Sequence, residues 1–297
     1  METFKVDYAP KGVNFYYVYK PLAHPEYNNF IAPVTLEERL MHVAEAKRML
    51  GSSATWLADT MDNVWHDVMA NTPNGELVID PEGRVVARRT WSDPEALRRD
   101  LEGLVGAVDH PTAIADLDLP IQPPPPTVAK GIVPRVEMPP SMAAIRIDAD
   151  LESTDIPFYV KARAEADQNL RENGVGTMYL GFHLDPIYRV HWNNEACPVR
   201  YKFSVPDGVT MTPLNGVGPD VEEAADADPR EFLMQVDTTN LDGPLDLEVF
   251  YFACDDALTF CIPVTQNYQI HLERDNHGRT IRTGVDNLPT AGRIPTG

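Results

Sequence analysis

Residues 251–265 read YFACDDALTFCIPVT, in which two apolar runs flank a short acidic turn. This pattern predicts a β-hairpin with Cys254 at the base of one strand and Cys261 at the base of the other. Thiols at such positions can face each other across the hairpin, so the geometry permits a disulfide without requiring one. Asp255 and Asp256 would raise the pKa of the Cys254 thiol, which favours a pair that is held oxidised or accepts electrons.

Short apolar runs with a period of two continue on both sides of this hairpin, broken by Gly, Pro and Asn. About eight strands at this spacing predict an all-β immunoglobulin-like sandwich over residues 143–275. Residues 276–297 are expected to form a mobile tail. The predicted strands cover residues 144–147, 158–163, 177–184, 189–192, 199–204, 232–236, 245–252 and 266–273.

Residues 108–142 separate this part of the chain from the first hundred residues. They contain the run QPPPP at 122–126, and further prolines follow at 134, 139 and 140. Because proline lacks a backbone donor and favours extended polyproline conformation, the segment predicts a semi-rigid linker. A proline-recognition motif is the functional alternative.

Residues 1–107 alternate strand-like runs with amphipathic stretches, which is typical of an α/β domain. A strand is predicted over 13–19. A helix is expected to begin after the N-cap Thr35 and to end at Gly51. A hairpin over 77–89 and a final helix over 94–105, capped by Ser92 or Asp93, complete the domain.

Several short motifs follow one another in this first domain. They are VNFYYVYK at 13–20, AHP at 23–25, DTMDN at 59–63, and TP at 72–73 ahead of LVIDPEGRV at 77–85. In this order the motifs resemble a thioredoxin-fold protein of the iodothyronine deiodinase and redoxin group. The resemblance implies an α/β thioredoxin-like domain that is incomplete at its N-terminus, because the family's cysteine-containing turn and central strand have no counterpart here. Dehalogenation would require that missing nucleophile.

The resemblance also implies roles for three residues. His24 would lie near the substrate as a proton donor, whereas the alternative is a histidine at a strand end. Asp62 would be an acid or base, or else the N-cap of a helix. Pro73 would correspond to the family's cis proline, which faces the active thiol.

The cysteine hairpin has its own resemblance. Together with GFHLDPIYRVHWNNEACPVR at 181–200 and VPDGV at 205–209, it resembles the N-terminal immunoglobulin-like domain of the thiol:disulfide interchange protein DsbD. That resemblance implies exchange of Cys254 and Cys261 with a redox partner protein. The chain departs from the family in the spacing of the pair and in having Val264 in place of a second proline. The alternative is a structural disulfide or a reduced pair of buried residues.

A third cysteine, Cys197, suggests a different chemistry. With His183 and His191 it could form a copper or zinc site, although histidines buried in a sheet are the simpler explanation. No metal and no other cofactor is expected.

The charge balance restricts the partners. The chain has 45 acidic and 25 basic side chains and a formal net charge of −20, so nucleic acid is not expected to bind. No apolar stretch predicts membrane insertion, and no export signal precedes the first strand. The sequence as written predicts a cytoplasmic protein, and a periplasmic one if its N-terminus is truncated.

The two resemblances imply a two-domain thiol-disulfide redox protein, a possible oxidoreductase, with Cys254 and Cys261 as its reactive pair. The rival hypothesis is a non-catalytic binding or assembly protein built on two redox folds. In that case a partner chain, or a second copy in a homo-oligomer, would complete the sheet of the first domain.

Overall fold

The computed structural model describes residues 1–22, 30–69, 72, 74–122, 128–238 and 243–275. The chain divides into two compact units. The first unit comprises Met1–Pro21 and Pro33–Pro125, and the second comprises Leu22–Ala32 and Pro126–Gly297.

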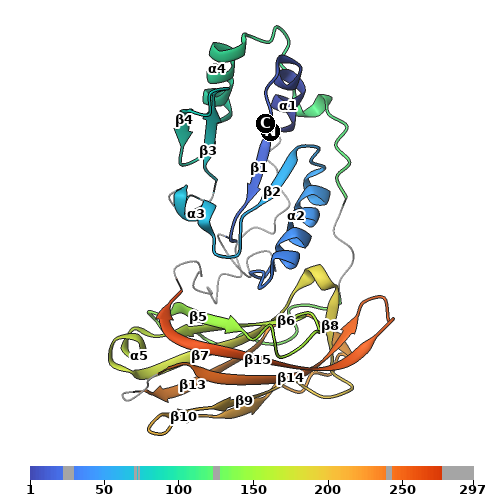
Figure 1. Ribbon diagram of the computed structural model, residues 1–297. Helices are drawn as coiled ribbons and strands as arrows, with labels where there is room; N and C mark the ends of the chain where they lie inside the picture. Colours follow the sequence, from blue (N-terminus) through green and yellow to red (C-terminus); the bar gives the residue numbers. More distant parts are fainter. Residues whose placement is uncertain (23–29, 70–71, 73, 123–127, 239–242, 276–297) are drawn as a thin grey trace. The chain divides into compact units, whose positions relative to one another are not determined.

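The first unit contains two small sheets and four α-helices in its described part (Figure 1). Strand β1 pairs in parallel with β2, and β3 pairs antiparallel with β4. The elements are α1 (Glu2–Tyr8), β1 (Tyr16–Tyr19), α2 (Leu36–Leu50), β2 (Thr55–Ala58), α3 (Val64–Val68), β3 (Glu76–Ile79), β4 (Val85–Arg89) and α4 (Pro94–Val105), with 3-10 turns at Ala9–Lys11 and Ile114–Asp116.

Local capping signals in this unit are confirmed. The Thr35 side chain accepts a hydrogen bond from the Glu38 backbone N–H at 3.1 Å, and α2 ends at Gly51 with a left-handed φ of 59°. Asp93 caps α4 by accepting the backbone N–H groups of Glu95 and Ala96, each at 3.0 Å.

The prediction of an α/β thioredoxin-like fold is wrong. Among the described residues, β1–β2 and β3–β4 are separate two-stranded sheets, and no strand joins them into one central sheet. The alternation of strand and helix patterns predicted the helices and strands from β1 to α4, but it carries no information on which strands pair. A small core of Phe4, Tyr8, Val78, Leu97 and Leu101 instead holds α1, β3 and α4 together.

The second unit is mostly β. All eight predicted strands are present, and three short strands were missed because two or three residues give no readable period. The elements are β5 (Ala143–Ala149), β6 (Val160–Ala166), α5 (Gln168–Asn173), β7 (Val175–Leu184), a 3-10 turn (Pro186–Tyr188), β8 (Val190–Asn193), β9 (Arg200–Ser204), β10 (Thr210–Thr212), β11 (Asn215–Val217), β12 (Ala225–Asp226), β13 (Arg230–Asp237), β14 (Leu245–Asp255) and β15 (Cys261–Arg274).

These strands form one 11-stranded sheet in the described residues, which corrects the predicted immunoglobulin-like sandwich of two sheets. The main path runs β10-β13-β7-β6-β5-β15-β14-β8-β12, while β9 and β11 branch from β14. Strand β5 pairs with β6 through Ala143 and Ala144, and with β15 further along its length. The strands are therefore connected through β5 into one curled sheet (Figure 1).

Tyrosine hydroxyls fasten the β14–β15 hairpin to β6. The Tyr251 hydroxyl donates to Gln266 Oε1 at 2.9 Å and accepts the Val160 backbone N–H at 3.2 Å. Tyr268 donates to the Val160 carbonyl at 2.8 Å. Burial raises the pKa of Tyr251 well above its ordinary value, so this hydroxyl stays protonated and keeps donating.

Part of the predicted linker is bound to the second unit. The Asp228 carboxylate accepts the backbone N–H groups of Gly131, Ile132 and Val133 at 2.7, 2.7 and 2.9 Å. Three such bonds fix the segment on the sheet beside β12.

Candidate functional site

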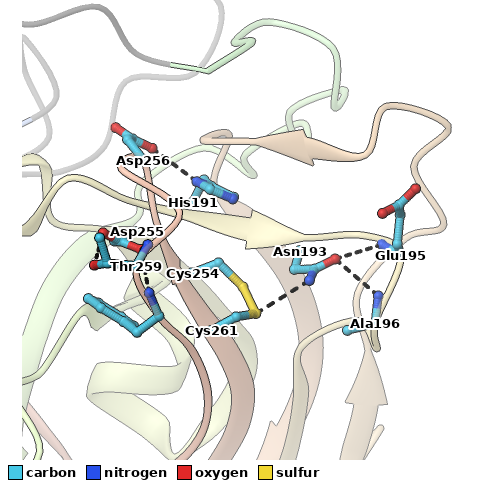
Figure 2. The surroundings of a disulfide bond; sticks show 10 residues. His191, Asn193, Glu195, Ala196, Cys254, Asp255, Asp256, Thr259 and Cys261 are labelled. Atoms are coloured by element: carbon cyan, nitrogen blue, oxygen red, sulfur yellow. Dashed lines mark hydrogen bonds and ion pairs between the residues drawn. A yellow bond between two sulfur atoms is a disulfide. The ribbon is translucent and has the colours of Figure 1, made fainter.

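The cysteine pair closes the long hairpin of β14 and β15. The register of the two strands runs from Leu245 opposite Ile270 to Cys254 opposite Cys261. The two cysteines are bonded to each other as a disulfide (Figure 2). Because this bond lies at the end of the strand pairing, it borders the turn of residues 256–260.

The two sulfur-bearing residues differ in their exposure. Cys254 lies on β14, between β15 and β8, and is 4% exposed. Cys261 begins β15 and is exposed. A thiolate from outside would have to approach a disulfide along the sulfur–sulfur axis, and Cys261 is the more exposed residue of this pair.

Asp255 organises the turn between the strands. Its carboxylate accepts hydrogen bonds from the Thr259 backbone N–H at 2.7 Å, the Thr259 hydroxyl at 2.6 Å and the Phe260 backbone N–H at 2.8 Å. The hydrogen bonds from Phe260 and Thr259 hold the pKa of Asp255 below its ordinary value. The carboxylate is thus engaged by the turn.

His191 lies beside the disulfide on the neighbouring strand. It is opposite Cys254 in the register of β8 and β14, and it is 6% exposed. Its Nδ1 lies 3.0 Å from Asp256 Oδ1. The Asp256 backbone N–H donates to the Arg189 carbonyl at 2.9 Å, which ties the turn to the start of β8.

Asn193 contacts the exposed sulfur directly. Its Nδ2 donates to Cys261 Sγ at 3.4 Å, while its Oδ1 accepts the backbone N–H groups of Glu195 at 3.0 Å and Ala196 at 3.1 Å (Figure 2). Sequence reasoning missed this residue. The stretch WNNEAC carries a turn signal in its consecutive asparagines, but nothing in it indicates a contact with a cysteine 68 residues away.

A buried ion pair anchors the turn that follows β8. Arg230 donates to both carboxylate oxygens of Asp226, at 2.9 and 2.6 Å, and its guanidinium lies 5.1 Å from the ring of Trp192. Asn194 donates to Asp226 at 2.7 Å and accepts from Arg230 at 3.2 Å. Burial raises the pKa of Asp226, but hydrogen bonds from Arg230 and Asn194 outweigh it and leave the pKa below its ordinary value.

The three residues of the alternative metal site have separate partners. His183 in β7 contacts the Tyr179 hydroxyl at 3.4 Å, His191 contacts Asp256, and Cys197 Sγ donates to the Pro198 carbonyl at 3.4 Å. Burial, together with nearby arginines, lowers the pKa of His183 well below its ordinary value. Within the described ranges, no group of three or more His, Cys, Asp or Glu residues could hold a metal ion.

The residues singled out by the thioredoxin resemblance are not brought to the disulfide. His24 and Pro73 lie outside the described residues. Asp62 is exposed and is not the N-cap of α3, since Asn63 takes that position. The backbone donors at the start of α3 are accepted by Asp59, which binds the N–H groups of Trp65 and His66 at 3.0 and 2.8 Å. The Asp59 carboxylate therefore caps the start of α3, which is the role that was expected of Asp62.

No protein-family model matches the chain, and neither a curated protein nor a solved structure shows significant similarity to it. The two resemblances therefore have no support from a known relative, and the case for function depends on the geometry at the disulfide. Of the helices in the described part of the chain, none is long and apolar enough to cross a membrane.

Proposed function

We propose that the protein exchanges thiols and disulfides through the Cys254–Cys261 pair, with Cys261 as the sulfur that is attacked. The observation that supports this most is the unequal exposure of the two cysteines in one disulfide. A bond that served only to staple the hairpin would function equally well with both cysteines buried. Here one sulfur is presented at the end of a hairpin that tyrosine hydroxyls fix in place.

The reaction requires a partner with two thiols. A partner thiolate attacks Cys261 Sγ, a bond forms between these two sulfurs, and the Cys254–Cys261 bond breaks with its electron pair passing to Cys254. The second partner thiolate then attacks the partner's own bonded sulfur and releases Cys261 as a thiolate. The partner is oxidised to a disulfide, and the cysteine pair, after taking up protons from water, is reduced to two thiols.

Reduced thioredoxin tests the proposal as a dithiol protein of known chemistry. The oxidised protein is incubated with it under native conditions, free thiols are alkylated, and the peptides are analysed by mass spectrometry. We expect both Cys254 and Cys261 to become alkylated within minutes. The Cys197→Ser variant, which keeps the pair, should react at the wild-type rate.

Two results would contradict the proposal. One is a disulfide that stays unreduced while the protein remains folded, which would identify a structural staple. The other is an equal rate of thioredoxin oxidation by the wild type and by Cys254→Ser, since that variant has no disulfide to reduce.

We propose self-assembly through the first unit as the second candidate function. In the described residues, β1 and β2 form one two-stranded sheet and β3 and β4 form another, and two-stranded sheets are marginally stable alone. Their sheets also expose apolar side chains, including Tyr16, Leu57 and Ile79. Sedimentation velocity over a hundredfold range of concentration should then show a dimer that forms equally in Cys254→Ser. A monomer throughout would contradict self-assembly.

A further inference from the structure

We propose that Asn193 is a catalytic residue that stabilises Cys261 as a thiolate and makes it the nucleophile of the reduced pair. This inference rests on the proposed exchange function. It also assigns different roles to two cysteines that the sequence does not distinguish. The single contact that carries it is the hydrogen bond from Asn193 Nδ2 to Cys261 Sγ at 3.4 Å.

The orientation of the Asn193 amide follows from its other contacts. Its oxygen accepts the backbone N–H groups of Glu195 and Ala196. With the amide reversed, the NH2 group would face two backbone donors and the oxygen would face the sulfur, so all three of these contacts would be lost. The amide N–H therefore points at Cys261.

The turn that carries Asn193 is held independently of the disulfide. The neighbouring Asn194 donates to Asp226 at 2.7 Å and to the Glu223 carbonyl at 2.8 Å. Asp226 is fully buried and paired with Arg230. Because these contacts do not involve sulfur, we expect the donor to stay in place when the disulfide opens.

A fixed amide donor acts more strongly on the charged form of the sulfur than on the neutral form. Hydrogen bonds to a thiolate favour it, and so lower the pKa of the thiol. When the mixed disulfide between Cys261 and a partner resolves, Cys261 leaves as a thiolate, and the same donor assists that step. The effect applies to Cys261 because Cys254 has no such amide contact among the described residues.

The charged groups around the cysteine pair do not stabilise a thiolate at Cys261, so this role falls to the Asn193 amide. Asp255 is engaged by the turn, and Asp256 is paired with His191 opposite Cys254. Glu195, in the turn after β8, is exposed and would disfavour a second negative charge nearby. The Asn193 amide is the donor that the described residues place on Cys261 Sγ.

Two substitutions remove the hydrogen bond to the sulfur while keeping the hydrogen bonds that hold the turn. Asn193→Asp keeps an oxygen that accepts both backbone N–H groups but has no donor for the sulfur. Asn193→Ser is neutral, can still accept from the turn, and is too short to reach the sulfur. Asn173→Asp, on the exposed face of α5, is the matched control because it adds the same charge elsewhere.

The measurement is the rate at which iodoacetamide alkylates each cysteine of the reduced protein as a function of pH, followed peptide by peptide. We expect the pKa of Cys261 to rise by about one unit in both Asn193 variants, which at neutral pH gives about tenfold slower alkylation. The Cys254 profile and the Asn173→Asp profile should stay close to the wild type.

An unchanged Cys261 profile in either Asn193 variant would overturn the inference. A shift in Asn193→Asp alone would indicate a charge effect without a lost donor. These outcomes are separate from failure of the proposed function, which is a wild-type disulfide that thioredoxin cannot reduce. Alkylation of the reduced protein can be measured in either case.

Discussion

Replacing Arg230 by leucine should destabilise the second unit severely. Arg230 is 2% exposed and donates to Asp226, Asn194 and the Asp228 carbonyl. Its removal leaves the carboxylate of Asp226, which is 0% exposed, without its counter-charge. Breaking a buried pair in this way costs about 3–5 kcal/mol, and the lost cation–π contact with Trp192 adds to this. We expect the free energy of unfolding to fall by about 4 kcal/mol.

Trp192 reports on this change because it packs against Arg230. The other tryptophans, Trp56, Trp65 and Trp91, lie in the first unit and are replaced by phenylalanine in the background used. Urea unfolding followed by fluorescence then measures the stability of the second unit. A loss below about 1 kcal/mol would refute the reasoning.

A compensating change tests whether the cost comes from the buried charge. Asn in place of Asp226 is neutral and still offers an oxygen to the Asp228 backbone N–H, which now donates to the carboxylate at 2.8 Å. The double variant Arg230→Leu/Asp226→Asn should therefore recover at least half of the lost stability. If it is no more stable than Arg230→Leu alone, lost packing and not the uncompensated charge is the cause.

Three further predictions concern stability. Replacing Cys254 and Cys261 by alanine should lower the free energy of unfolding by about 2.5 kcal/mol, which is the chain-entropy value for a disulfide that joins residues seven apart. Urea unfolding measures this loss, and an unchanged midpoint would contradict the prediction. The pKa of Asp226 is lower in the folded state than in the unfolded state, so its ionisation contributes fully to the stability of the fold above a pH of about 3.9. This contribution is lost as the pH falls through the folded-state pKa. Calorimetry should therefore show a smaller acid-induced fall in Tm for Asp226→Asn than for the wild type. Tyr251→Phe removes the hydroxyl that donates to Gln266, and should cost about 1–3 kcal/mol in urea unfolding, whereas an unchanged stability would argue against this contact.

Features that short segments encode were predicted from the sequence. Thr35 and Asp93 cap their helices as expected, because an N-cap needs only a side-chain oxygen and the next few backbone N–H groups. The hairpin of β14 and β15, with Cys254 opposite Cys261, likewise follows from apolar residues on both sides of one turn, whereas the bond between the two sulfurs was left open by the sequence.

Features that depend on distant segments were not predicted. The period of two identified β5 but could not show that it pairs with both β6 and β15, which turns an expected sandwich into one curled sheet. The Asn193 contact with Cys261 has the same origin, since it depends on β8 lying next to β14. The sequence also could not identify which aspartate caps α3. Asp59 and Asp62 both precede this short helix, and only the fold decides which one accepts its N–H groups.

Trapping the mixed disulfide tests the central claim most directly. The oxidised protein is mixed with a thioredoxin that retains one active-site cysteine, so that the reaction stops at the covalent intermediate, and the linked peptides are identified by mass spectrometry. We predict that the bond is to Cys261, the exposed member of the pair, and that Cys254 is recovered as a free thiol. A bond to Cys254, or no covalent complex while the protein stays folded, would contradict this account of the site.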